Sequence, residues 1–317
     1  MSFSDRLDKL VRGGAPLGGL SDLAFDRQSG SWASTIDNHG TDPARLWFWS
    51  DSRNPSVDRD PLVLRRPDGT AYDGRTTDNE GLAVLPGGDF LVSSEAEPSI
   101  RVFGRDGVQQ ASLDVPARFA VTGSTPQGQA TVDATLEGLT IAPAGTRIVA
   151  AMESPLSSDA DPTLNRFLVY DRDQHGSWQL TKQITYRTER GNRVPEIQAY
   201  GADSLLVLEG SYSPGAGNSV SLYAVTGISH AADVSGVANL SQGPASAVVT
   251  KSLVADLARC PALAAPTRQA QRNPLLDNFE GMAVTEGPGD ATVTLISDDN
   301  FAANQITRVL SLTVHLP

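Results

Sequence analysis

The sequence contains one cysteine, Cys260, and four histidines among 317 residues. A lone cysteine cannot form an intramolecular disulfide or a zinc site built from cysteines. The histidines show no metal-ligand spacing such as His-Glu-x-x-His. A metal site in this chain would therefore have to be built from the oxygen atoms of acidic side chains.

Long apolar runs and a basic surface are also missing. No run of 18 apolar residues occurs, so we expect no transmembrane helix. The first residues, MSFSDRLDKLVRGG, lack the apolar stretch of a signal peptide. If the natural protein is exported, we expect this chain to be its mature part. The net charge of −12 argues against a nucleic-acid partner bound through a basic face.

Sequence motifs of several enzyme classes are absent as well. There is no Gly-x-Ser-x-Gly nucleophile elbow, no phosphate-binding Walker loop and no dinucleotide fingerprint. Aromatic residues make up only 6% of the chain, and we expect the run Trp47-Phe48-Trp49 to be a buried strand. These absences leave an α/β-hydrolase or a nucleotide-binding fold without support.

A short acidic sequence motif, Glu-Gly, recurs along the chain. Glu80-Gly81, Glu137-Gly138 and Glu280-Gly281 each precede an apolar strand, a turn and a second apolar strand that ends in acidic residues. Weaker copies lie around Glu196 and around Ser21, where serine replaces the glutamate. Glycine (29 residues) and proline (20 residues) supply the turns between short strands.

The spacing of this motif predicts an all-β fold, a β-propeller. Glu80 and Glu137 are 57 residues apart, and Glu137 and Glu196 are 59 apart. Repeats of three or four antiparallel strands at such intervals are typical of propeller blades. The 84 residues from Glu196 to Glu280 leave room for one hidden blade. We therefore expect six blades, although five or seven also fit.

We expect one propeller domain over residues 1–317. Residues 1–17 would be an N-terminal lead-in, and residues 227–275 a degenerate blade with a loop excursion. Within the latter, Lys251–Leu263 has the apolar spacing of a short helix that ends at Pro261.

Propeller topology predicts that the acidic residues meet at one mouth of the central channel. The first strands would bring Glu80, Glu137, Glu196 and Glu280, and the returning second strands would bring a further set: Asp51, Glu95, Glu153, Glu209, Asp298 and Asp299. A single such glutamate can simply cap backbone N–H groups. Several carboxylates together repel one another unless a cation intervenes. Oxygen ligands favour Ca²⁺ or Mg²⁺, whereas pairing with arginine, for which Arg53, Arg75 and Arg166 are candidates, is the competing solution.

Four motifs occur along the chain in this order: NEGLAV, LEGLTIAPAGTRIVAAMESPL, DNFEGMAV and the closing SDDNF. Together they resemble the phytase-like family of bacterial propellers, described as having esterase-like activity of phytase. The resemblance runs from about Gly18 to the C-terminus and is weakest over residues 227–275. It implies a propeller fold, export to the periplasm or beyond, and hydrolysis of ester or phosphoester bonds with carboxylate-held Ca²⁺. The chain departs from the family pattern at Leu208-Glu209-Gly210, where an arginine is usual in place of the glycine.

Three hypotheses follow. The first is a phytase-like hydrolase of small phosphate or carboxylic esters, with a divalent cation, Ca²⁺, at the channel mouth. Its catalytic candidates are Glu80, Glu137 and Glu280, and its metal-ligand candidates are Glu80, Glu137, Glu153, Glu196, Glu209, Glu280, Asp298 and Asp299. The second is a non-enzymatic propeller that binds a ligand or a protein on the same face, and the third is a lactonase-like metal-dependent hydrolase.

Overall fold

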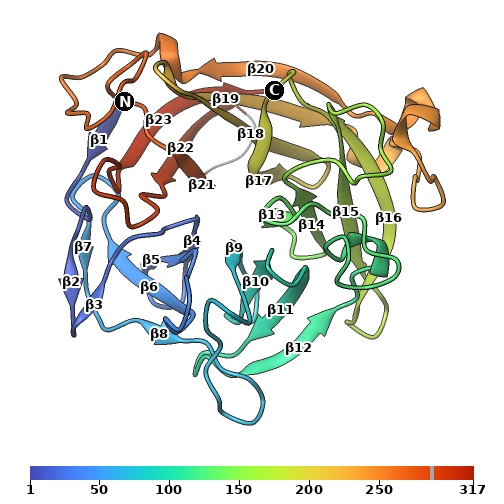
Figure 1. Cartoon of the computed structure of the whole chain (residues 1–317), viewed down its shortest axis with the longest axis horizontal. Helices are drawn as coiled ribbons and strands as arrows, with labels where there is room; N and C mark the ends of the chain where they lie inside the picture. Colours follow the sequence, from blue (N-terminus) through green and yellow to red (C-terminus); the bar gives the residue numbers. More distant parts are fainter. Residues whose placement is uncertain (286–288) are drawn as a thin grey trace.

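The computed structural model describes residues 1–285 and 289–317. Five sheets are arranged around a central axis like the blades of a propeller, as Figure 1 shows in the view down that axis. The innermost strand of each sheet lies against the innermost strands of its two neighbours, and the last contacts the first, which closes the ring. These inner strands are β4 (Asp22–Asp26), β9 (Asn79–Val84), β13 (Leu136–Ile141), β17 (Arg193–Gly201) and β21 (Phe279–Thr285).

Each inner strand begins an antiparallel meander that runs outward. The first blade continues with β5 (Ser31–Thr35) and β6 (Arg45–Ser50), on which both β7 (Ser56–Val57) and β8 (Leu62–Val63) pair. The second continues with β10 (Phe90–Ser94), β11 (Ser99–Phe103) and β12 (Gln109–Leu113), and the third with β14 (Arg147–Met152), β15 (Leu164–Arg172) and β16 (Trp178–Arg187). The fourth continues with β18 (Ser204–Ser213), β19 (Gly217–Thr226) and β20 (Thr250–Asp256), and the fifth with β22 (Gly289–Ser297), β23 (Val309–Leu316) and β1 (Ser2–Ser4).

The predicted β-propeller is confirmed, but the expected number of six blades is wrong. The strands assigned to a hidden blade within residues 227–275 and just before them are β19 and β20, which belong to the same sheet as β17 and β18. The long interval to Glu280 arises from the connection between β19 and β20, which contains three short 3-10 turns, and from the long loop after β20. The spacing of the repeats in the sequence gave the wrong blade number because long loops, and not an extra sheet, account for the 84 residues between Glu196 and Glu280.

The segment Lys251–Leu263 is also not a helix. It forms most of β20 and then one 3-10 turn, Leu257–Arg259. Every helical element of residues 1–285 and 289–317 is a three-residue 3-10 turn. None of them is long and apolar enough to cross a membrane.

The N-terminal residues take part in closing the ring. In β1, Ser2 pairs with Ser311 and Phe3 with Leu310 of β23, so the first strand of the chain completes the last blade. Arg308, which is fully buried, donates to both carboxylate oxygens of Asp5 at 2.7 and 2.8 Å. Val11–Arg12 (β2) and Ala15–Pro16 (β3) then form a small hairpin.

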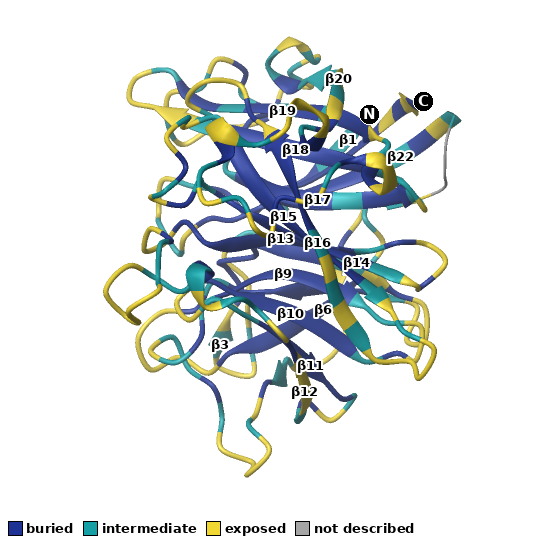
Figure 2. Ribbon diagram, turned by 90° about the vertical axis from the view of Figure 1, so that its right-hand side faces the viewer, coloured by how far each residue is buried: buried dark blue, intermediate teal, exposed yellow. Residues whose placement is uncertain are grey.

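The core lies between neighbouring sheets. Between blades three and four, for example, Phe167 and Val149 belong to one apolar cluster with Ile197 and Val207. The expected burial of Trp47-Phe48-Trp49 is confirmed, since each of these residues is at most 2% exposed. Figure 2 shows the buried strands in the middle of the molecule and the exposed loops at its periphery.

The glycine of the recurring Glu-Gly pair has a packing role. A Cβ atom at Gly81 of β9 would lie 2.5 Å from the backbone oxygen of Glu137 on β13. At Gly281 of β21 it would lie 2.6 Å from Cα of Asp22 on β4. Inner strands therefore approach each other near the axis more closely than a side chain permits.

This close approach predicts that Gly81→Ala destabilises the fold. The added methyl group would collide with backbone atoms, which cannot rotate away as a side chain can, and overpacking of this kind costs about 1–3 kcal/mol. Urea unfolding of the variant beside Gly87→Ala, whose site has open space around the new Cβ atom, measures the difference. Equal stabilities of the two variants would contradict the packing role.

Candidate functional site

Six of the predicted acidic residues meet at one mouth of the channel. Glu80, Glu137 and Glu280 are each the second residue of an inner strand, while Glu95, Glu153 and Asp298 each follow directly after a second strand. Antiparallel pairing of first and second strands brings both sets to the same face. Each of the six is at most 9% exposed.

Two further aspartates complete this group, and the sequence did not reveal them. Asp78 lies immediately before β9, and Asp37 lies two residues after β5. The expectation for Asp51 is wrong, because RLWFWS is the third strand of its blade: Trp49 pairs with Trp32 near the start of β5, so Asp51 lies at the opposite face. The second strand is the short SWAST, which ends at Thr35, two residues before Asp37. The missed signal was the aspartate in Ile36-Asp37, at the level where the other blades have Glu95 and Asp298.

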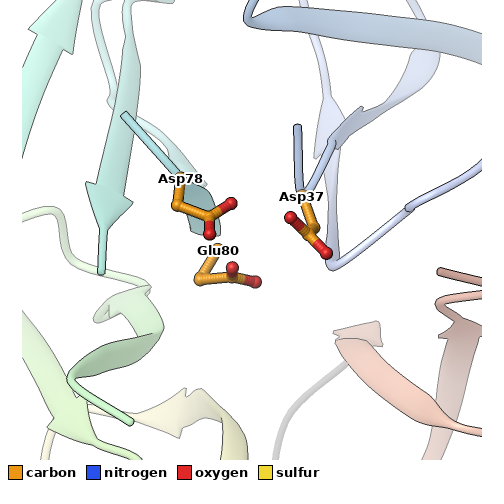
Figure 3. Close-up of side chains that lie close together, drawn as sticks. All are labelled: Asp37, Asp78 and Glu80. Atoms are coloured by element: carbon orange, nitrogen blue, oxygen red, sulfur yellow. The ribbon is translucent and has the colours of Figure 1, made fainter. Parts of the chain in front are cut away.

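The acidic side chains form two overlapping triads. In the first triad, oxygen atoms of Asp37, Asp78 and Glu80 all lie within 4.8 Å of one another (Figure 3). In the second triad, oxygen atoms of Glu80, Glu95 and Glu137 satisfy the same limit. Glu80 belongs to both, so its carboxylate stands between the two groups.

Several oxygens of the triads have no hydrogen-bonding partner. Among residues 1–285 and 289–317, Glu80 takes part in no hydrogen bond to a nitrogen or hydroxyl donor and in no ion pair, although it is only 7% exposed. Glu137 Oε2, Asp37 Oδ1 and Asp78 Oδ1 are likewise buried without a nitrogen or hydroxyl donor, and the carboxyl groups of Asp37 and Asp78 hydrogen bond to each other. His39 Nδ1 lies 3.3 Å from Asp37 Oδ1, outside hydrogen-bonding geometry. Buried oxygens of this kind are costly unless something satisfies them.

Burial and mutual repulsion raise the pKa values of these carboxyl groups. Burial is the largest cause for Glu80, whose pKa is raised well above its ordinary value and further by Glu137, Glu95 and Asp78. Burial raises the pKa of Glu95 to about 8. It raises the pKa of Asp37 to about 10, with Asp78 adding to the effect. Without a cation, the triads therefore retain protons at neutral pH.

Arg193 balances the other side of the mouth. It is the first residue of β17, and its guanidinium group reaches three carboxylates of the two neighbouring blades: Nη1 lies 2.7 Å from Glu153 and 3.3 Å from Glu137, and Nη2 lies 2.6 Å from Glu280. Burial alone would lower the pKa of Arg193, but the three carboxylates outweigh it and raise the pKa. Glu137 pairs with the arginine through Oε1, and its Oε2 is buried without a hydrogen-bond partner.

The arginines proposed from sequence are not the ones at the mouth. Arg53 and Arg75 are exposed. Arg166 is fully buried and donates to both oxygens of Asp159 at 2.8 Å, away from the mouth acids. Arg193 was missed because it precedes the weak fourth copy of the repeat, where only the register of β17 reveals that it lies at the mouth.

Blade four is displaced by one position, so Glu196 does not join the mouth acids. Gly138 of β13 packs against Glu196, and Gly281 of β21 packs against Asp22, so these two acids lie one residue deeper than the other glutamates. Along a strand, one residue reverses the direction of the side chain. Glu196 and Asp22 hydrogen bond to each other instead.

Two other predicted ligands have partners of their own. Glu209 lies within β18 and accepts hydrogen bonds from Tyr186 Oη at 2.7 Å and Lys251 Nζ at 2.5 Å. Asp299 pairs with Lys9 and accepts the backbone N–H of Gly19 at 2.9 Å. Both carboxylates are satisfied by the protein, and neither belongs to a triad.

The residues of the triads fit a hard divalent cation. All donors are carboxylate oxygens, the ligands that Ca²⁺ and Mg²⁺ prefer, and no histidine or cysteine is a member of either group. The buried Glu80 residue, which has no donor among the described residues, and the buried, unpartnered Oε2 of Glu137 are the observations that a bound cation would account for. A cation would also remove the repulsion that raises their pKa values.

Comparison with solved structures shows similarity of fold. A β-1,3-galactosidase of the GH43 class, determined with galactodeoxynojirimycin, is 10% identical, with 95% of this chain and 91% of that chain covered and a TM-score of 0.53. The periplasmic gluconolactonase of Pseudomonas aeruginosa (13% identity, 97% and 89% covered, TM-score 0.37) and a protein of unknown function from Dyadobacter fermentans (12%, 100% and 87%, 0.45) are too distant to support an argument.

Comparison with curated proteins gives no significant match. The profile of the phytase-like family, described as esterase-like activity of phytase, matches residues 15–301. This match spans all five inner strands and all the mouth acids, and it confirms the resemblance noted in the sequence. The chain therefore belongs to the phytase-like family of β-propellers.

Proposed function

We propose that this protein is a hydrolase of small phosphate or carboxylic esters that uses a divalent cation, Ca²⁺, at the channel mouth. The observation that carries the proposal is the buried Glu80 carboxylate. It has neither a hydrogen-bond donor nor a cationic partner among the described residues. One of its oxygens lies within 4.8 Å of oxygens of acids from both neighbouring blades. Membership of the phytase-like family supports a hydrolase-type propeller.

The side chains at the mouth divide into two roles under this proposal. Glu80, Glu95 and Glu137 would hold the cation, which when bound polarises the ester oxygen and so supplies Lewis-acid chemistry. Glu280, Glu153 and one oxygen of Glu137 are held by Arg193, which orients them and leaves them less free to bind metal. Among the catalytic candidates, Glu80 and Glu137 therefore remain the best placed to contact a cation or to accept a proton from water.

Calcium is expected to raise the unfolding temperature of the wild-type protein relative to chelator. A ligand that binds the native state alone stabilises it by about 2.7 kcal/mol at a concentration 100 times its dissociation constant. Glu80→Gln should abolish this shift because it removes the shared ligand charge. Differential scanning calorimetry in Ca²⁺ and in EDTA, followed by assays on phosphate monoesters, carboxylic esters and lactones, measures both binding and turnover.

The matched control is Asp106→Asn, which changes an exposed acid in the turn between β11 and β12. This variant should keep the full calcium shift and full turnover. A calcium shift that survives in Glu80→Gln would refute the metal site, and turnover that survives there would refute the catalytic assignment. Turnover confined to lactones would favour the lactonase-like reading.

The pairing of Arg193 favours one other candidate function. A guanidinium group already pairs with three of the mouth acids, which is the arrangement expected of a propeller that binds a ligand or a protein without catalysis. This alternative predicts no turnover of any ester or lactone in the assays above, with or without calcium.

A further inference from the structure

We propose that the channel mouth binds two cations, with Glu80 as their shared ligand. This inference rests on the proposed function in using the same mouth, but it concerns the number of metal sites and their assignment to residues. The Asp37–Asp78–Glu80 triad and the Glu80–Glu95–Glu137 triad each place three carboxylate oxygens within 4.8 Å of one another. The two triads share Glu80 and have no other member in common.

The two triads come from different inter-blade contacts. Asp37 follows β5 of blade one and Asp78 precedes β9 of blade two, so the first triad lies between blades one and two (Figure 3). Glu95 follows β10 of blade two and Glu137 belongs to β13 of blade three. A cation bound in one triad would have Glu80 and two other acids as ligands. The two acids of the other triad that are not Glu80 would then have no cation.

Each triad has its own unsatisfied oxygens. In the first, Asp37 Oδ1 and Asp78 Oδ1 are buried without a nitrogen or hydroxyl donor, and the two carboxyl groups hydrogen bond to each other. In the second, Glu137 Oε2 is buried without a partner. Glu80 stands in both, more than nine-tenths buried and unpaired among the described residues. A single cation would satisfy one of these sets only.

The charge at the mouth also calls for more than one cation. Among residues 1–285 and 289–317, Arg193 is the only lysine or arginine with an ion pair to the mouth acids, and it contacts only Glu137 of the five triad residues. His39, near Asp37, is exposed and makes no hydrogen bond to it. When ionised, five carboxylates in close contact repel one another strongly, and two divalent ions would nearly neutralise them in place of the protons that they otherwise retain.

The test is calcium titration by isothermal calorimetry on chelator-stripped protein at pH 8. Wild type should bind two Ca²⁺ ions per chain. Asp37→Asn and Glu95→Gln should each bind one, and Glu80→Gln, which removes the ligand that the two sites share, should bind neither. Each substitution keeps the size of the side chain, and circular dichroism in EDTA confirms that each variant is folded.

The outcomes separate this inference from the proposed function. One ion in wild type, lost in Glu95→Gln but kept in Asp37→Asn, would overturn the two-cation site and leave a single-cation hydrolase intact. No calcium binding in wild type would overturn both. Loss of both ions in Asp37→Asn would overturn the assignment of one ion to each triad. Two ions in wild type, with one lost in Asp37→Asn, one lost in Glu95→Gln and both lost in Glu80→Gln, support the inference.

Discussion

Arg193→Met is expected to lower the free energy of unfolding by about 3–5 kcal/mol in calcium-free buffer. Removing one partner of a buried ion pair leaves the other charge uncompensated, and losses of this size follow. Arg193 is the partner of three such carboxylates, at 2.6 Å from Glu280, 2.7 Å from Glu153 and 3.3 Å from Glu137. Methionine keeps much of the side-chain volume, so the loss reports on charge rather than on a cavity. Urea unfolding in EDTA measures the effect.

Arg193→Lys is the matched control. Lysine keeps the positive charge but cannot donate from two nitrogens at once to Glu153 and Glu280. We therefore expect the free energy of unfolding of Arg193→Lys to lie between that of wild type and that of Arg193→Met. The readout specific to charge is the pH dependence. The methionine variant should regain stability as pH falls from 7 to 5, because Glu137 and Glu153, whose pKa values burial raises, no longer face a positive charge and take up protons. Wild-type stability of Arg193→Met at pH 7 would show that the arginine does not balance the mouth acids.

Glu196→Ala is expected to lower the free energy of unfolding by about 4 kcal/mol, whereas Glu196→Gln should be tolerated. Glu196 Oε1 accepts the backbone N–H groups of Leu139 at 2.9 Å and Ile197 at 2.6 Å. Leaving these buried donors unsatisfied costs about 1–3 kcal/mol each. Glu196 also hydrogen bonds to Asp22, which itself accepts the N–H groups of Leu82 and Met282. The two acids thus connect all five inner strands across the axis.

The pair also makes stability fall as pH rises. Burial raises the pKa of Asp22 to about 7 from 3.8 and raises that of Glu196 well above 4.5. The folded protein therefore keeps protons that the unfolded chain has released, and this contribution to stability, complete below pH 4, is lost as pH rises through 7. Glutamine retains a donor for Asp22 without needing a proton. Glu196→Gln should therefore flatten the decline by up to about 1.4 kcal/mol per pH unit.

Thermal unfolding of wild type, Glu196→Gln and Glu196→Ala in EDTA from pH 5 to pH 8 tests this. The glutamine variant should gain on wild type steadily toward pH 8, while the alanine variant stays below wild type at pH 5. Parallel pH profiles for wild type and glutamine would mean that Glu196 carries no proton in the folded protein. The other mouth acids also titrate, but they are common to all three proteins and cancel in the comparison.

The sequence was sufficient wherever the repeat was strong. The Glu-Gly pairs at Glu80, Glu137 and Glu280 indicated the inner strands, the propeller and the shared mouth, because strand polarity alone places their glutamates at one end. It was insufficient where a copy was weak. In blade four, a shift of one residue sends Glu196 to Asp22 rather than to the mouth, and no pattern in the chain marks that shift.

Blade number and charge balance illustrate the same division. Six blades were expected because a long connection between β19 and β20 looks like a missing blade in the sequence, and only strand pairing shows that both strands belong to one sheet. Asp37 and Asp78 lie far from Glu137 along the chain, and no local pattern relates them. Their proximity to Glu80 depends on how five sheets close around an axis.

The stretch from Asp277 to Phe301 shows the limit most clearly. By itself, the sequence determined that Glu280 and Asp298 end on the same face, since antiparallel strands joined by a turn must return there. Only the tertiary structure decided what balances their charge. Arg193, from another blade, reaches Glu280, while Asp299 turns away to Lys9. The counter-charge of Glu280 comes from another blade, so the closed ring and not the local sequence selects which mouth acids are paired and which remain open to a cation.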